Sequence, residues 1–234
     1  MNPERYRLSF TTGGLFPREA PLVAERYLTL RDWSRTREGL RQDNLLQVRT
    51  AAASIRIGQE LIARLELLDG DELAELLVAT PRDRGYLLWS AACRRYAFLH
   101  DFAVEVLREY HLRLRRQLTL SDYDAFFNGK ALWHPELDEL AASTRLKLRQ
   151  NLFRMLREAD LLSDRGQIQP ALLTSHLGQL LARQGPEALF IFPATDNEIQ
   201  RWLPSAAVRL IGAQSGTLGL GHRRRASVAW RPTA

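Results

Sequence analysis

The sequence predicts a mainly α-helical protein: two winged-helix or helix-turn-helix-like lobes, a central helical layer that joins them, and a small β-hairpin wing. Apolar residues recur at helical spacing through most of residues 17–162. Three amphipathic segments are followed by a short hairpin signal, and the first 70 residues carry a weaker version of the same order. We therefore divide the chain into residues 1–70 (N-terminal helix-turn-helix-like lobe), 71–112 (central helices), 113–185 (C-terminal winged lobe) and 186–234 (extension with a basic tail).

The composition indicates a globular chain. The sequence has 234 residues, of which 45% are hydrophobic, enough for a real core. Its single cysteine, Cys93, rules out an internal disulfide framework and is expected to be buried. The first ten residues contain no apolar signal region, and no stretch has the roughly 18 apolar residues that a membrane span needs. We expect a cytoplasmic protein without membrane contact.

Helical signals define the first lobe. In "PREAPLVAERYL", Pro17 suits a first helical turn. "RDWSRTREGLRQ" predicts a second helix and "TAAASIRIGQELIARLELL" a third. Gly70 is expected to follow the end of that third helix, and Pro81 should stop the next one.

The segment "RGYLLWSAACRRYAFLHDFAVEVLREYHL" is too long for one ordinary helix. We expect it to bend near His100 and Asp101, which would form an internal polar pair. Its high apolar density predicts that it is the central packing layer of the protein.

The second lobe has clear helix boundaries. Thr119 or Ser121 should cap a helix that ends at Asn128-Gly129, and Ser143 or Thr144 should cap the helix that follows. "LLSDRGQIQPALL" then predicts two short strands around a turn at 164–166. A shift of 94 residues aligns the first lobe with the second and suggests an internal duplication; it pairs Trp33 with Phe127, Leu46 with Leu140, Thr50 with Thr144, Ile62 with Leu156, and Leu67-Leu68 with Leu161-Leu162.

Positive charge is concentrated in two stretches. The chain has 33 basic and 27 acidic residues, a formal charge of +6. Residues 205–234 hold five arginines and no acidic residue, and the tail "GHRRR" could add non-specific affinity or have no role. Residues 143–157 hold another five basic residues without an acidic one: Arg145, Lys147, Arg149, Arg154 and Arg157.

The helix over 143–159 is the candidate DNA-binding element. Leu148, Leu152, Met155, Leu156 and Ala159 form a stripe that should be buried. The opposite side should carry Ser143, Lys147, Gln150 and Arg154, flanked by Arg157 and Asn151, with Leu146 and Phe153 forming a second apolar edge. In a helix-turn-helix, the N-terminal part of the second helix contacts base edges in the major groove. The predicted DNA-binding residues are Ser143, Thr144, Arg145, Lys147, Gln150, Arg154 and Arg157, with Arg49 and Arg56 at the equivalent first-lobe face. Glu60 on that face would repel a phosphate.

Other interpretations remain open. The row on helix 143–159 could be an ordinary solvated face, and a basic helix could equally bind RNA. Alternatively, the chain is a protein-interaction adaptor that docks another subunit through the acidic segment 66–75 or the Leu146/Phe153 edge, with only incidental nucleic-acid affinity.

No motif of an enzyme is present, so we expect a non-catalytic protein without cofactor or metal. The five histidines do not form an HExxH or HxH pattern. In "WHPELDEL", His134 is expected to cap a helix rather than bind a metal. "GTLGLG" lacks the strand–turn–helix context of a dinucleotide-binding loop.

Several of these stretches together resemble the BrxA family, a small component of BREX phage-resistance systems. They are "LSFTTGGLFPREA", "DNLLQVRTAAASIRI" with "ARLELL", "LLWSAACRRYAFLHDFAVEVLREY", and "LSDYDAFFNGKALWHPELDELAASTRLKLRQNLFRMLREADLL" followed by "GQIQPALL". The resemblance covers roughly residues 6 to 182. It implies a cytoplasmic helical protein with helix-turn-helix-like lobes that works beside other BREX subunits, with a DNA-binding or assembly role rather than catalysis.

Overall fold

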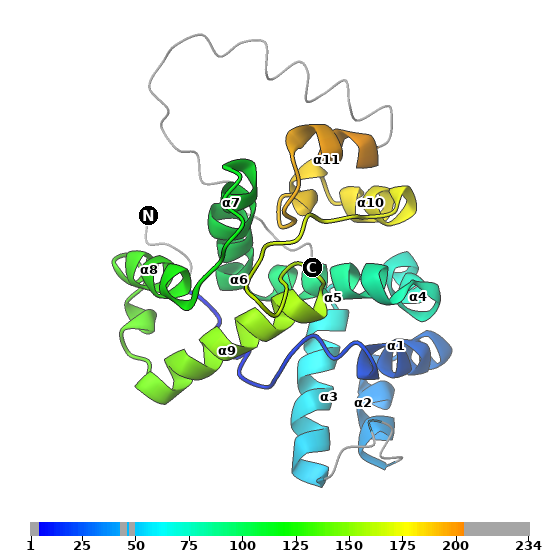
Figure 1. The fold of residues 1–234 in the computed structure, drawn as a ribbon. Helices are drawn as coiled ribbons and strands as arrows, with labels where there is room; N and C mark the ends of the chain where they lie inside the picture. The colour runs from blue at the N-terminus through cyan, green and yellow to red at the C-terminus, as the bar shows by residue number, and fades with distance from the viewer. Residues whose placement is uncertain (1–4, 43–45, 47–49, 204–234) are drawn as a thin grey trace.

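The protein is mainly α-helical, as the sequence predicts (Figure 1). The computed structural model describes residues 5–42, 46 and 50–203. None of the helices within these residues is long and apolar enough to cross a membrane. The α-helices are α1 (Glu19–Leu30), α2 (Trp33–Gln42), α3 (Ala51–Leu65), α4 (Gly70–Val78), α5 (Pro81–Arg95), α6 (Ala97–Phe102), α7 (Glu109–Leu112), α8 (Leu120–Ala131), α9 (Ala142–Glu158), α10 (Ser175–Ala182) and α11 (Asp196–Trp202). Shorter helical turns are η1 (Ala103–Arg108), η2 (Pro135–Leu137) and η3 (Pro186–Leu189).

In the first lobe, α1 packs against α2, α3 and α4. Helix α1 begins at Glu19, so Pro17 precedes the helix instead of lying in its first turn. Thr50 caps α3 by accepting the Ala53 N–H. Gly70 comes after the end of α3 at Leu65, but it is also the first residue of α4, which Asp69 caps through a reciprocal pair of bonds with Glu72.

The central layer breaks earlier than predicted. Helix α5 ends at Arg95 because Tyr96 takes an extended backbone conformation, with φ −126° and ψ 98°. His100 and Asp101 lie within α6, which continues through the π-helical turn η1 into α7 without a bend at either residue. The fully buried Tyr96 side chain lies at this break, which the run of apolar residues did not indicate.

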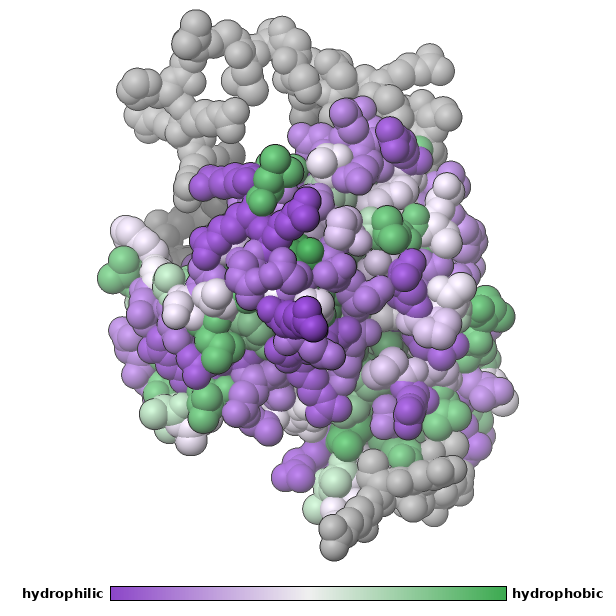
Figure 2. Space-filling model, in the orientation of Figure 1, coloured by the Kyte–Doolittle hydropathy of each residue, from purple (hydrophilic) through white to green (hydrophobic). Residues whose placement is uncertain are grey.

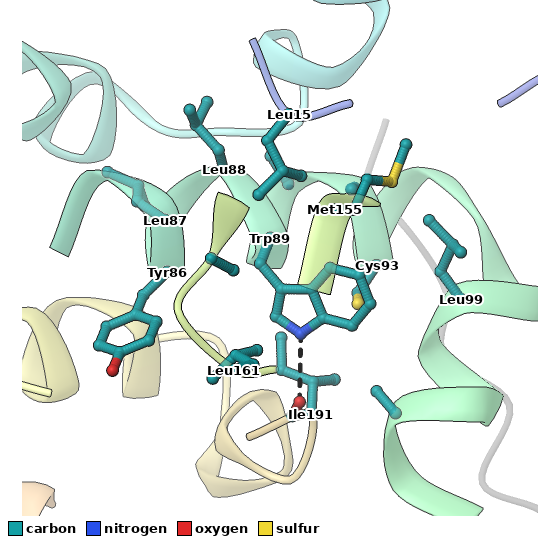
Figure 3. Packing of buried hydrophobic residues seen from close by; sticks show 14 of the residues in the cluster. Leu15, Tyr86, Leu87, Leu88, Trp89, Cys93, Leu99, Met155, Leu161 and Ile191 are labelled. Atoms are coloured by element: carbon teal, nitrogen blue, oxygen red, sulfur yellow. Dashed lines mark hydrogen bonds between the residues drawn. The ribbon is translucent and has the colours of Figure 1, made fainter. Parts of the chain in front are cut away.

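Trp89 lies at the centre of the core (Figure 3). The figure shows Leu15, Met155, Leu161 and Ile191 around its indole ring, so segments far apart in the sequence meet there. The Trp89 Nε1–H donates to the Ile191 carbonyl oxygen at 3.2 Å, which satisfies the only polar atom of the side chain. Ten of the fifteen residues of α5 are buried, which agrees with the high apolar density of this segment.

The second lobe begins with the predicted cap. Thr119 accepts the Asp122 N–H, and the Asp122 carboxylate accepts the Thr119 N–H in return. Helix α8 continues to Ala131, because a single glycine at 129 lowers helix stability by only about 1 kcal/mol and does not end a helix.

The predicted hairpin appears as isolated bridges within the described residues. Leu162 pairs antiparallel with Ile168, and Gln117 with Gln167. The second pair brings in a segment before α8 that the sequence did not indicate.

An irregular N-terminal segment, residues 5–16, contacts both α3 and α9; we call it the strap. Tyr6, Phe10, Leu15 and Phe16 of the strap are buried. The Asn151 side chain donates to the Phe10 carbonyl at 2.9 Å. No periodic pattern marks such a segment, so sequence analysis missed it.

Residues 186–203 belong to the packed structure. Phe192 and Ile199 are buried, α10 packs against α4, α5 and α11, and Arg108 donates to Asp196 at 2.5 Å. The five arginines of residues 205–234 lie outside the described residues.

Candidate nucleic-acid interface

Helix α9 begins earlier than its predicted caps. Its N-cap is Ala141, whose side chain makes no capping hydrogen bond. Ser143 and Thr144 therefore lie in the first turn and do not cap the helix. The first turn carries no acidic side chain, so the partial positive charge of the helix N-terminus is not compensated there from within the helix.

The buried stripe of α9 is confirmed. Leu148, Leu152, Met155, Leu156 and Ala159 are all fully buried. Their spacing places them on one side of the helix, and that side packs toward α5 and the Trp89 core. The stripe fixes the rotation of α9, and this determines which side chains point outward.

The predicted outward row is exposed. Ser143, Lys147, Gln150, Arg154 and Arg157 are all accessible to solvent. Asn151 does not flank the row, because it is buried and bound to the strap. The apolar edge is also split: Phe153 is buried, whereas Leu146 is exposed. In Figure 2, hydrophilic side chains predominate over the region where Figure 1 draws α9.

Two arginines of α9 are engaged by α8 instead of facing a ligand. Arg149 donates to Asp124 at 2.6 Å. Arg145 donates to Asn128 at 2.8 Å, and its guanidinium lies over the Phe127 ring, 4.2 Å from the ring centroid. The predicted DNA-binding residue Arg145 thus contributes to the joint between α8 and α9. Asp124 lies about twenty residues before these arginines, so the absence of acidic residues within α9 did not reveal the pairing.

The exposed cations of the row differ in how they are held. Arg154 pairs with Glu158 at 2.7 Å, and Arg157 pairs with Asp164 at 3.8 Å. The Arg157–Asp164 pair is solvent-exposed and contributes roughly 0–1 kcal/mol, so an incoming phosphate can replace its carboxylate. Glu158 is only 19% exposed and also accepts the Leu15 N–H, so the Arg154 pair is held more firmly. Lys147 makes no hydrogen bond or ion pair to any residue that the structure describes.

The first-lobe face is only partly described. Arg56 is exposed on α3, whereas Arg49 lies outside the described residues. The prediction that Glu60 would repel a phosphate is wrong, because Glu60 is buried. Its Oε1 accepts hydrogen bonds from Arg64 Nε at 2.7 Å and from the Tyr96 hydroxyl at 2.5 Å.

One carboxylate of the acidic segment 66–75, that of Glu72, is used inside the protein. Glu72 is fully buried and forms two hydrogen bonds with Arg94, at 2.5 and 2.7 Å. Glu66 pairs with Arg37, Asp71 with Arg183, and Glu75 with His176. The Glu66 and Asp71 side chains remain 39% and 70% exposed despite these pairs, so the acidic surface that the adaptor interpretation uses is only partly neutralised.

His134 does not cap a helix with its side chain. Its Nδ1 lies 3.1 Å from Glu136 Oε1, and its ring stacks on Tyr6 at 3.9 Å between centroids. Burial acts to raise the pKa of Glu136, but bonds from the Tyr6 N–H and His134 outweigh it, so the pKa lies below its ordinary value. Within the described residues, no three His, Cys, Asp or Glu side chains gather as metal ligands would.

His100 and Asp101 are part of a larger polar cluster. His100 Nδ1 lies 3.5 Å from Asp101, which also accepts the Tyr6 hydroxyl at 2.5 Å and Lys130 at 2.9 Å. Burial acts to raise the pKa of Asp101, but these three donors lower it to about 2. The cluster ties the strap to the second lobe, a structural role for an ionised carboxylate.

Comparisons with known proteins agree with the resemblance seen in the sequence. The family model for BrxA matches residues 4–185. The BREX protein BrxA of Escherichia coli O9:H4 (strain HS) is 26% identical over 179 residues, which cover 76% of this chain and 84% of that protein. The crystal structure of an uncharacterized protein from Magnetospirillum magneticum has a TM-score of 0.69 at 19% identity, covering 80% of this chain and 97% of the other. The structural likeness concerns the fold alone.

Proposed function

Because this chain belongs to the BrxA family, we propose that it is an accessory subunit of a BREX phage-defence system that binds double-stranded DNA and has no catalytic role. The relative from Escherichia coli is a BREX protein. Membership in such a system implies that the chain works with other BREX subunits.

The exposed row Ser143–Lys147–Gln150 is the observation that carries the DNA-binding proposal. It lies on the first three turns of a helix whose opposite side is fixed in the core. Side chains spaced three and four residues apart follow one helix face, and the major groove, about 12 Å wide, admits one helix. Lys147 has no carboxylate partner among the described residues and is available to a phosphate or a base edge.

The order of elements in the second lobe supports a winged helix-turn-helix. A helical stretch from α6 to α7 is followed by residues 116–118, by α8, by a connection that contains η2, and by α9. The chain then turns at 164–166. The Leu162–Ile168 bridge joins the two sides of this turn, and the Gln117–Gln167 bridge joins the turn to the segment before α8. On this interpretation α9 is the recognition helix and the turn is the wing.

The adaptor interpretation keeps one specific observation in its favour. Leu132 and Trp133 are 78% and 72% exposed in the connection between α8 and α9, and Leu146 is also exposed. Exposed apolar side chains of this size are typical of protein contacts. A chain that binds a second BREX subunit but not DNA would match this alternative.

The test is a pair of charge-matched double variants. Lys147→Glu with Gln150→Glu changes the row by three charges without touching a described hydrogen bond. Arg18→Glu with Gln184→Glu makes the same change at exposed positions on other elements. We expect the row variant to lose binding to a mixed-sequence DNA duplex in a fluorescence anisotropy titration at roughly 100 mM salt, and the control to retain it. Binding of the wild type should also weaken steeply as salt increases.

Two results would overturn the proposal. Equal binding by both folded variants would remove α9 from the interface. A wild type that prefers duplex RNA in competition would change the partner from DNA to RNA. Circular dichroism and thermal melting of every variant ensure that a loss of binding reflects the surface and not the fold.

A further inference from the structure

The wing turn and the segment before α8 form a compact corner, residues 116–118 and 163–169. The Ile168 N–H donates to the Arg116 carbonyl at 2.7 Å, and the Leu118 N–H to the Gly166 carbonyl at 2.9 Å. Gly166 has φ +76°, and a Cβ there would lie 2.9 Å from the Leu118 carbonyl oxygen. The backbone of the corner is therefore held in one arrangement, which only glycine permits at this position.

Two arginines stand out on this corner. Arg116 and Arg165 are both exposed, and neither side chain has a hydrogen bond or ion pair to the residues that the structure describes. Nearby arginines differ: Arg113 pairs with Glu109 at 3.2 Å, and Arg115 with Asp122 at 2.6 Å. The corner thus displays two guanidinium groups that no carboxylate of the described chain neutralises.

The corner adjoins the C-terminal end of α9. Arg157, on the outward row, reaches Asp164 of the corner at 3.8 Å. The Asp164 side chain is fully exposed and has no other partner in the described part of the chain. Asp164 is thus the carboxylate of the corner that pairs with a cation of α9, and Arg157 is its one partner among the described residues.

The spacing fits a duplex. The rise of 1.5 Å per residue puts Arg157 about 15 Å along the helix from Lys147. The major groove is about 12 Å wide. If Lys147 and Gln150 lie in the groove, Arg157 and the corner beyond it reach the phosphate strand that borders the groove.

We propose that this corner is a second contact point of the duplex, where Arg116 and Arg165 bind backbone phosphates and Asp164 occupies, in the free protein, the place that a phosphate takes on Arg157. This inference rests on the proposed DNA-binding function. It adds that the contact is insensitive to base sequence, because guanidinium groups on a phosphate backbone carry no base information.

Removal of Asp164 provides a test that a folding defect cannot imitate. Asp164→Asn should free Arg157 and tighten binding to a mixed-sequence duplex, because the competing carboxylate is gone; we expect about two- to five-fold, the factor that corresponds to a surface pair of roughly 0.5–1 kcal/mol. Glu25→Gln, at an exposed position on α1, removes the same charge and should leave affinity nearly unchanged. Equal tightening by both variants, or none by Asp164→Asn, contradicts the assignment of Asp164.

The arginines are tested by the salt dependence. Arg116→Ala with Arg165→Ala should lower the slope of log affinity against log salt by about 1.8, or about 0.9 for each lost phosphate contact. Arg18→Ala with Arg35→Ala, also exposed, removes the same charge from the first lobe and should leave the slope unchanged. If the slope of the corner variant stays at the wild-type value, the proposal that Arg116 and Arg165 bind backbone phosphates is wrong.

The outcomes separate the two proposals. If the Lys147/Gln150 variant loses binding while the corner variants behave as wild type, the corner does not contact DNA and the DNA-binding function stands. If no variant on α9 or the corner alters binding, both proposals fail together.

Discussion

Arg64 and Glu158 hold the two sides of one peptide group. Arg64 Nη1 donates to the Gly14 carbonyl at 2.8 Å, and the Leu15 N–H donates to Glu158 at 2.5 Å. Each residue has an ion-pair partner one turn earlier, Glu60 for Arg64 and Arg154 for Glu158. The two pairs are 94 residues apart in the sequence, the offset at which we suggest an internal duplication, and their charges are reversed. The strap peptide is thus clamped between α3 and α9.

The clamp leaves no room for a side chain at position 14. A Cβ on Gly14 would lie 2.0 Å from Glu158 Oε2. Gly14→Ala should lower the free energy of unfolding by about 2–3 kcal/mol, because the carboxylate must leave the Leu15 N–H. Urea denaturation measures this. Gly129→Ala in α8, where a Cβ meets nothing within 4 Å, should instead stabilise the protein by up to about 1 kcal/mol. Equal effects of the two substitutions would argue against the clamp.

The buried Glu72–Arg94 pair should be costly to break. Both side chains are buried, and Arg94 also donates to the Leu67 carbonyl at 3.0 Å. Glu72→Ala leaves a buried cation without its partner and should cost about 3–5 kcal/mol of unfolding free energy. Glu66→Ala removes the exposed partner of Arg37 and should cost less than about 1 kcal/mol. Chemical denaturation of both variants measures the two free energies of unfolding. A loss at Glu72→Ala as small as that at Glu66→Ala would contradict the prediction that the buried pair is costly to break.

Asp101 should make stability depend on pH in the acid range. Its pKa is about 2 in the folded protein against an ordinary value of 3.8. The folded value is depressed, so the stabilisation is fully present above the ordinary pKa and is lost as pH falls from about 4 toward 2. Wild type should lose more stability than Asp101→Asn between pH 5 and pH 2.5, measured as the shift in urea midpoint. Parallel pH profiles for the two proteins would remove Asp101 from this role.

Cys93 should be unreactive in the native protein. The side chain is buried, and burial raises the pKa of its thiol well above the ordinary value. A thiol held in its neutral form is a poor nucleophile. Titration with a disulfide reagent at pH 8 should modify the thiol only in denaturant, with a native rate that follows global unfolding. Fast labelling of the native protein would show that this part of the core opens locally.

Local patterns predicted the local features of this fold. The buried stripe of α9 follows from helical spacing of apolar residues, and the Thr119 cap from a hydroxyl three residues before an acid. The exposed row could be predicted for the same reason, because a stripe on one side of a helix leaves the other side outside. These features depend on residues within a few turns of one another.

The features that were missed depend on contacts between distant residues. Asp124 neutralises Arg149 from another helix, the strap binds α9 across more than a hundred residues, and Glu60 is buried by Arg64 and Tyr96 together. A helical pattern places Glu60 on a face but does not state what covers that face. A count of charges along the sequence therefore includes groups that the tertiary structure pairs, and Arg145, predicted to bind DNA, donates to Asn128 of α8.

Because of the clamp, the strap cannot reach its folded position until α9 has been synthesised. The Leu15 N–H and its acceptor Glu158 are 143 residues apart, and ribosomes add roughly 5–20 residues per second. A nascent chain therefore carries the apolar residues around Phe10 and Leu15 for about 7–30 s before the helix that receives them is synthesised. Until then this apolar segment is exposed to chaperones and to neighbouring chains. Substitutions in α9 that slow the docking of the strap should therefore reduce the yield of soluble protein, even where they do not change the stability of the folded protein.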